Sequence, residues 1–225
     1  MLPAVISVVG KSNSGKTTFL EKLIGVLKAR GYNVGVIKHD THGFEMDHEG
    51  KDSYRLFHAG SASTMIVSDK KCALVKNLPQ PLSLDETVNT FFYDVDIVIT
   101  EGFKRENKQK IEVSRKENST ELLCSDDELI AFVSDYKIDR KAPVYGLNDA
   151  EGVAGLLEKK FLNERKAVES HDFLTLRADG KRVGVKDFVQ DFIAGGINGM
   201  ASALRGVENP EVLEIVIRKS GRKKT

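Results

Sequence analysis

The chain has 225 residues, a net charge of +1 and 30% charged residues. This length is enough for one α/β core with a small appendage, and the balanced charge gives no indication of a nucleic-acid or membrane partner. No apolar run approaches the roughly 18–20 residues of a transmembrane span, and the apolar N-terminus lacks the features of a secretion signal. Cys72 and Cys124 form no C-x-x-C motif, so we expect free thiols and a soluble, cytoplasmic protein.

Strand patterns alternate with helix patterns along most of the chain. Residues 4–9 form an apolar, β-branched run typical of a central parallel strand, and residues 17–30 carry an apolar stripe of helical spacing. Further strands are expected at 34–37, 64–67, 73–75, 96–100, 111–114, 129–134 and 143–147, with helices from the Ser83 capping box to the early 90s and from Asn148-Asp149 to about Leu162. This alternation predicts an α/β fold with an open, mostly parallel sheet.

The pattern changes in the C-terminal quarter. An Asp-Gly turn lies between alternating strands in 173–185, a helical stretch follows at 187–204, and 212–217 is strand-like, which predicts a small α+β unit of type ββαβ. The expected borders are 1–163 for the first domain, 164–170 for a linker, 171–220 for this unit and 221–225 for a basic tail. The unit can serve as a dimer contact, a cofactor-binding appendage or a docking module, and the sequence leaves these roles open.

One motif indicates the chemistry. Residues 10–17 read G-K-S-N-S-G-K-T and match G-x-x-x-x-G-K-[ST] between a strand and a helix, the context that a P-loop requires. Backbone N–H groups of such a loop surround phosphates, Lys16 is expected to reach the β- and γ-phosphates, and the Thr17 hydroxyl is expected to bind Mg²⁺. The expected nucleotide-binding residues are Gly10, Lys11, Ser12, Asn13, Ser14, Gly15, Lys16, Thr17 and Thr18. The motif therefore predicts a P-loop NTPase.

A P-loop also needs a carboxylate near Mg²⁺ at the end of another core strand. The run D-I-V-I-T-E-G ends in Glu101, which we expect to bind the ion directly or through water; an acid that merely caps the strand is the alternative. Asp96, at the other end of the run, is expected to face away. Lys104 begins a basic stretch that either neutralises phosphates of a second ligand or is simply solvated. Lys16 and Glu101 are the expected catalytic residues.

Four of the five histidines lie between residues 38 and 60, interleaved with acids. Their spacing fits no closed zinc pattern, and no cysteine is near. Ligands of open α/β sheets bind beyond the carboxyl ends of strands, so a segment that leaves the second strand beside the P-loop favours a switch or pocket wall over a metal site. The expected pocket or switch residues are Lys38, His39, Asp40, Asp47, Lys51, Asp52, Gly102 and Lys104. We also expect Asp52-Ser53 to cap a short helix.

Three sequence blocks together carry a family resemblance. They are G-K-S-N-S-G-K-T-T, then K-H-D-T-H-G-F…D-H-E-G-K-D-S-Y-R…A-G, then T-E-G-F-K, and they resemble the MobB family of molybdopterin-guanine dinucleotide biosynthesis over about residues 1–160. The resemblance implies a homodimeric P-loop GTPase fold that binds GTP·Mg²⁺ and is at most a slow GTPase. It also implies partnership with the guanylyltransferase that joins GMP to molybdopterin, and molybdopterin as a further ligand.

Some features depart from common GTPase patterns. The chain has no N-K-x-D motif, and its nearest equivalent is Asn148-Asp149, where Asp149 either reads guanine or caps a helix. Lys11 has the spacing of a lysine that reaches across a dimer in some P-loop proteins, but Ser12-Asn13 replaces the usual glycines, which favours a solvent-facing side chain. The alternatives in function are a nickel-type metallochaperone GTPase and a P-loop small-molecule kinase.

Overall fold

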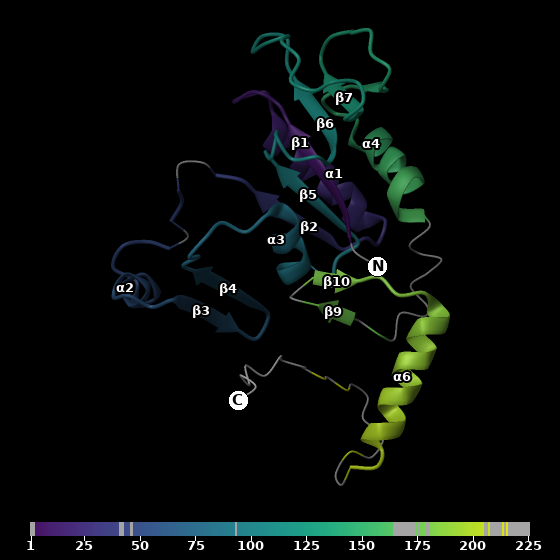
Figure 1. The fold of residues 1–225 in the computed structure, drawn as a ribbon. Coiled ribbons are helices and arrows are strands. Elements are labelled where there is room, and N and C mark those ends of the chain that lie inside the picture. Colours follow the sequence, from purple (N-terminus) through teal and green to yellow (C-terminus); the bar gives the residue numbers. More distant parts are fainter. Residues whose placement is uncertain are drawn as a thin grey trace, which may run out of the picture.

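The structure is a computed structural model that describes residues 3–40, 43–45, 47–92, 94–163, 174, 176–178, 181–204, 207, 213 and 215. At its centre is a six-stranded parallel sheet in the order β2-β5-β1-β6-β7-β8 (Figure 1). These strands are β1 (Ala4–Val9), β2 (Val34–Lys38), β5 (Ile97–Glu101), β6 (Gln109–Ser114), β7 (Leu129–Ser134) and β8 (Val144–Tyr145). The predicted open parallel sheet is confirmed, and β1 and β7 have the bounds expected from the sequence.

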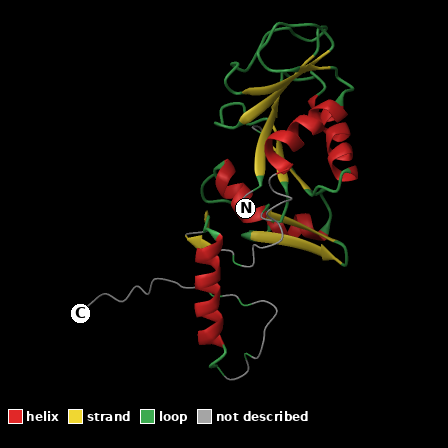
Figure 2. Cartoon of the chain, turned by 90° about the vertical axis from the view of Figure 1, so that its right-hand side faces the viewer, coloured by secondary structure: helices red, strands yellow, loops and turns green. Residues whose placement is uncertain are grey.

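Helices cover both faces of this sheet (Figures 1 and 2). They are α1 (Lys16–Ala29), α3 (Leu84–Phe91) and α4 (Ala150–Leu157), the last continued by a π-helical turn, η1 (Glu158–Leu162). Leu23 of α1 and Leu157 of α4 pack on one face with Ile99 of β5, whereas Leu84 of α3 packs on the other face with Val98. Successive strand residues point to opposite faces, so the β-branched runs fill both cores.

A short helix and a hairpin lie beside the central sheet. The helix is α2 (Asp52–His58), and the hairpin joins β3 (Ser63–Ser68) to β4 (Lys71–Lys76) in antiparallel register. The hairpin packs on α2 and stands apart from the parallel strands in Figure 1. This pair of strands was predicted, and the structure assigns it to a separate two-stranded sheet.

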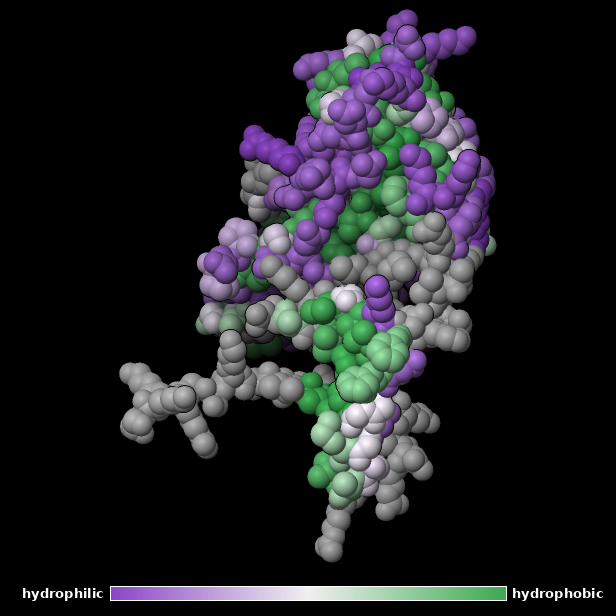
Figure 3. All heavy atoms as spheres, turned by 45° about the vertical axis from the view of Figure 1, so that its right-hand side comes forward, coloured by the Kyte–Doolittle hydropathy of each residue, from purple (hydrophilic) through white to green (hydrophobic). Residues whose placement is uncertain are grey.

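The C-terminal unit contains a second hairpin and one long helix. Strand β9 (Leu176–Ala178) pairs with β10 (Lys181–Val183), β10 lies against α3, and α6 spans Asp187–Ala201. Figure 3 shows apolar side chains gathered on the surface of α6, where Phe188, Phe192 and Met200 are exposed. No helix in the described part of the chain is long and apolar enough to cross a membrane.

Most differences from the predicted elements are at their ends. Strand β8 is shorter than the predicted 143–147. Just before it, the Pro143 carbonyl accepts a hydrogen bond from Phe132 N of the neighbouring strand β7. The predicted capping box is present, since Ser83 and Glu86 satisfy each other's backbone N–H groups. The predicted linker at 164–170 and tail at 221–225 lie outside the described residues, as does most of the predicted strand at 212–217.

Two buried charged side chains on β6 hold the loop that follows it. Lys110 Nζ lies 2.7 Å from Glu128 Oε1 and donates to the Glu106 carbonyl. The Glu112 carboxylate accepts hydrogen bonds from the backbone N–H groups of Leu123 and Cys124, at 2.8 and 3.1 Å. Because buried charges require partners, these contacts fix the path of residues 115–128 over the sheet.

The two cysteines differ in burial, and we therefore expect them to differ in reactivity. Burial, followed by the nearby Glu112 carboxylate, raises the pKa of the Cys124 thiol to about 12, whereas Cys72 is exposed. Since the thiolate is the reactive form, we expect a disulfide reagent at pH 8 to modify one thiol per chain rapidly. In the Cys72→Ser variant the rapid phase should vanish, and its persistence would show that Cys124 is accessible.

Candidate functional site

The loop between β1 and α1 has the local geometry of a phosphate cradle. Gly15 stands at the N-terminus of α1 with φ of +89°, a left-handed conformation that favours glycine. Lys16 Nζ donates a 2.8 Å hydrogen bond to the Lys11 carbonyl, so its side chain folds back over the loop. The Ser14 hydroxyl is buried and has no hydrogen-bond partner among the residues that the structure describes.

The electrostatic surroundings of Lys16 suit a polyanion. Burial is the largest cause that lowers the pKa of this ammonium group, and the cations Lys104 and Lys38 lower it further, while Glu101 raises it. Lys16, Lys38, Lys104 and the Glu101 carboxylate therefore lie close enough to interact at this edge of the sheet. A bound phosphate chain would offset the repulsion among the lysines and stabilise their charged forms.

Glu101 lies where the Mg²⁺ carboxylate was predicted. It ends β5, the strand next to β1, and both of its carboxylate oxygens lie 3.2 Å from Thr17 Oγ1. The donor set of a hydroxyl and a carboxylate consists of hard oxygen ligands, which Mg²⁺ prefers. Asp96, at the opposite end of β5, accepts a hydrogen bond from Asn33 N and lies away from the loop, as predicted.

These side chains surround a cavity of about 440 Å³. Its lining residues are Ser12, Asn13, Gly15, Lys16, Thr17, Thr18, Glu101 and Arg115. The first seven were predicted from the sequence as nucleotide or metal ligands. Arg115 was not predicted, because it belongs to no motif and only the order of the strands brings it here: it follows β6, the other neighbour of β1.

The start of the histidine-rich segment is joined to the Glu101 strand end. Lys38 pairs with Glu101 in the register of β2 and β5, and His39 N donates to the Glu101 carbonyl at 3.0 Å. The His39 ring lies 4.5 Å from the Phe103 ring, centre to centre. Gly102 has φ of +104°, and a Cβ placed on it would lie 3.2 Å from His39 Cβ, so a side chain there would be strained and crowded.

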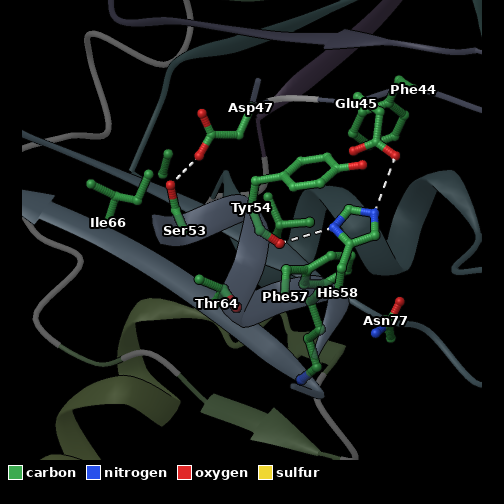
Figure 4. A pocket seen from close by; sticks show the side chains of 13 residues that line it. Phe44, Glu45, Asp47, Ser53, Tyr54, Phe57, His58, Thr64, Ile66 and Asn77 are labelled. Atoms are coloured by element: carbon green, nitrogen blue, oxygen red, sulfur yellow. Dashed lines mark hydrogen bonds and ion pairs between the residues drawn. The ribbon is translucent and has the colours of Figure 1, made fainter. Parts of the chain in front are cut away.

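Later residues of this segment line a different cavity. A volume of about 250 Å³ lies between Phe44, Glu45 and Asp47, helix α2 and the β3–β4 hairpin (Figure 4). Tyr54 and Phe57 of α2 face it, with Ile66 of β3 on the hairpin side. Its polar groups include Asp47, Glu45 and His58, which are labelled in Figure 4, and the buried Thr64 hydroxyl, which has no hydrogen-bond partner within the described ranges.

Some of the predicted switch residues lie near the P-loop cavity, and one of them, Asp47, lines the second cavity instead. Lys38 and Lys104 act on Lys16 at the phosphate cavity, whereas Asp47 lines the second cavity and accepts from the Ser53 hydroxyl. The expected cap of α2 is wrong in detail: the N-cap residue is Lys51, and no side chain caps the helix. Asp52 is instead its first residue, while Ser53 bonds to Asp47 because that carboxylate is within reach.

Lys11 and Asp149, the two residues with competing predicted roles, both have partners in the structure. Lys11 Nζ contacts the Glu121 carboxylate, and its side chain is about one-third exposed, so it is held against the 115–128 loop. Asp149 caps α4, since its Oδ1 accepts a 2.9 Å hydrogen bond from Gly152 N. The predicted helix cap is thus confirmed, and a guanine contact by Asp149 stays a prediction.

The histidines of the segment have separate surroundings. His58 Nε2 lies 3.7 Å from Glu45 Oε1, His39 lies near Phe103, and His48 N donates to Asp47. His42 lies outside the described residues. Among the residues that are described, no group of three or more histidine, cysteine or acidic side chains is arranged to hold a metal ion.

Comparison with known proteins places this site in a family. A family model described as "MobB: Molybdopterin guanine dinucleotide synthesis protein B" matches residues 5–135. The molybdopterin-guanine dinucleotide biosynthesis adapter protein of Haemophilus influenzae is 37% identical over 155 residues, which are 68% of this chain and 87% of that protein. The crystal structure of Bacillus subtilis MobB is similar with a TM-score of 0.56 and 27% identity, over 70% of this chain and 98% of that one.

A third relative extends the likeness to the C-terminal unit. The putative molybdopterin-guanine dinucleotide biosynthesis adapter protein of Methanocaldococcus jannaschii is 30% identical over 237 residues, which cover 95% of this chain and 97% of that protein. The family match includes the P-loop, the Glu101 strand and the histidine-rich segment. The chain belongs to the MobB family and is an adapter protein of molybdopterin-guanine dinucleotide biosynthesis.

Proposed function

We propose that the chain binds GTP·Mg²⁺ through its P-loop and assists the guanylyltransferase that joins GMP to molybdopterin. The observation that carries the proposal is the cavity in which Lys16, the Thr17 hydroxyl and the Glu101 carboxylate converge. Lys16 and the backbone of the loop would hold the phosphates, and Thr17 and Glu101 would hold the ion. Mg²⁺ bound there would neutralise phosphate charge. Family membership favours this adapter over a metallochaperone or a small-molecule kinase.

Hydrolysis is at most slow in this proposal. The residues that line the phosphate cavity in the described part of the chain include no glutamine to orient an attacking water, and Glu101 is engaged with Thr17. Guanine is the proposed base because the names of the relatives contain molybdopterin-guanine dinucleotide. Asp149 is the proposed reader of the base, through its Oδ2 atom, because Oδ1 is engaged at the helix cap.

The nucleotide proposal is tested by calorimetry with GTP, GDP and ATP, with and without Mg²⁺. We expect Lys16→Ala to weaken GTP binding by roughly 100-fold or more, because several charge-assisted hydrogen bonds to phosphate are lost. Glu101→Gln should reduce the Mg²⁺-dependent part of the affinity and leave binding without Mg²⁺ unchanged. Lys28→Ala, on the exposed end of the same helix, is the matched control. Equal affinity for ATP would show that guanine is the wrong base.

We further propose that the cavity beside α2 binds the pterin of molybdopterin. Its chemistry fits a flat ring system that carries polar edges: Tyr54 and Phe57 supply aromatic surface, and the Glu45 and Asp47 carboxylates accept N–H groups such as those of a 2-amino-4-oxo ring. The buried Thr64 hydroxyl lacks a partner, and a ligand atom would supply one. A volume of about 250 Å³ accommodates one bicyclic ring.

Pterin binding is measured by fluorescence titration with pterin itself. Tyr54→Ala removes a stacking surface and Thr64→Val removes the unpaired hydroxyl, so both variants should bind pterin about 5- to 20-fold more weakly. Leu56→Ala, on the exposed side of α2, should bind as the parent does. The same variants should lose stimulation of GMP transfer by the guanylyltransferase while GTP affinity stays constant. Unchanged pterin affinity in both cavity variants would refute the assignment.

A homodimer is the third element of the proposal. The β3–β4 hairpin exposes Met65 and Val67, and no further strand pairs with either of its edges in the described part of the chain. Exposed apolar strands of this kind are typical of surfaces that pair with another chain. A second copy related by a two-fold axis would cover this surface on both protomers.

Sedimentation equilibrium tests the dimer. We expect the parent protein to be dimeric and Val67→Glu to be monomeric, because a charge would be buried in the contact. Leu122→Glu places the same charge at another partly exposed site and should stay dimeric. A parent protein that is monomeric at all concentrations, or a dimeric Val67→Glu variant, would contradict this part of the proposal.

A further inference from the structure

Arg115 occupies a position that the P-loop motif does not reveal. It is the first residue after β6, and β6 lies on the side of β1 opposite to β5. The carboxyl ends of parallel strands meet at one edge, so Glu101 and Arg115 stand on either side of the P-loop. Both line the same cavity.

The contacts of the Arg115 guanidinium are incomplete. Its Nη2 atom would lie 3.4 Å from a Cβ placed on Gly15, so the group sits directly against the loop. Its Nε atom is buried and makes no hydrogen bond to any residue in the described part of the chain. Nη1 lies 3.5 Å from Glu117, whose side chain is 78% exposed, and a pair of this kind contributes little.

The backbone of Arg115 has a structural role that does not need its side chain. The Arg115 carbonyl accepts hydrogen bonds from Asn118 N and Ser119 N, which close the turn after β6. The loop is held separately by Glu112, through Leu123 N and Cys124 N. A buried guanidinium N–H without a hydrogen-bond partner is energetically unfavourable. A ligand bound at the P-loop would supply the partner that Arg115 Nε lacks.

We propose that Arg115 is a phosphate ligand of the nucleotide site and holds the α- and β-phosphates against the N-terminus of α1. The inference rests on the proposed nucleotide function and deepens it. The planar guanidinium presents parallel N–H donors that match two phosphate oxygens. Gly15 lies in the part of a P-loop whose backbone N–H groups surround the α- and β-phosphates, whereas the motif lysine reaches the β- and γ-phosphates. Arg115 thus binds GTP and GDP alike.

The experiment compares Arg115→Gln and Arg115→Lys with the parent protein in calorimetric titrations with GTP, GDP, guanosine and inorganic tripolyphosphate, all with Mg²⁺. We expect Arg115→Gln to lower the affinity for GTP, GDP and tripolyphosphate by about 10- to 100-fold and to leave guanosine unchanged. Arg115→Lys keeps the positive charge but not the parallel N–H donors of the guanidinium, so it should lower these affinities less than Arg115→Gln does. Glu117→Gln removes the exposed partner of Arg115 and should bind as the parent does.

The outcomes separate this inference from the wider proposal. Thermal unfolding checks that each variant is folded. If Arg115→Gln is not folded, the titration is repeated with Arg115→Ala. If Lys16→Ala loses GTP while Arg115→Gln binds GTP and GDP like the parent, Arg115 is no ligand and the nucleotide function stands. An equal loss for guanosine would likewise overturn the inference. If tripolyphosphate binds in an Arg115-dependent manner but the calorimetry of the nucleotide proposal finds equal affinities for GTP and ATP, the guanine assignment fails and the Arg115 inference stands. A parent protein that binds none of these ligands would overturn both.

Discussion

The parallel pairing of β1 with β5 and β6 is the constraint on which the site depends. Hydrogen bonds of the ladder fix Val8 opposite Glu101 and Val9 opposite Glu112, so the relative positions of three strand ends follow from backbone register alone. A slip of one residue would turn the apolar side chains of β1 from one helix layer to the other. The apolar side chains that alternate between the two faces of the sheet fix the strand register. The register in turn fixes the positions of Glu101 and Arg115 at the strand ends.

The loop after β6 is held by charges that the core encloses. Lys110 and Glu112 alternate with Ile111 and Val113, which are fully buried against the other face of the sheet. Lys110 and Glu112 are buried, so the loss of their partners would leave a charge uncompensated in the core, which costs more than an exposed ion pair contributes. Because Lys110 and Glu112 both have partners, these charged side chains in the strand are compatible with a stable sheet. It also links the strand interior to the surface beside the P-loop, where Glu121 contacts Lys11.

The parts of the fold that the sequence predicted are those with strong local signals. The P-loop motif, the capping box at Ser83 and the apolar runs of β1 and β7 are each recognisable from a short stretch of sequence, and all are present. The end of the late strand was less well predicted, because β8 lies at the edge of the sheet and pairs on one side only.

The composition of the two cavities was predicted only in part. Arg115 reaches the P-loop through strand order, which no local pattern encodes. The histidine-rich segment is continuous in sequence, yet Asp47, which precedes α2, and His58 of α2 line a separate cavity together with residues of the hairpin. The position of the segment after β2, beside the P-loop, correctly placed Lys38 and His39 near Glu101. It did not show that residues further along the segment line the second cavity.

The contact between His39 and the Glu101 strand end has a thermodynamic consequence. His39 N is bonded to the carbonyl of the residue proposed to hold Mg²⁺, and His39 begins the segment that leads to the aromatic cavity. Any preference that this connection transmits must be reciprocal: if nucleotide changes the affinity of the cavity for its ligand by some factor, that ligand changes the affinity for nucleotide by the same factor. With such coupling, the occupancy of each site would depend on whether the other ligand is bound, and the state with both ligands bound would be favoured if the coupling is positive.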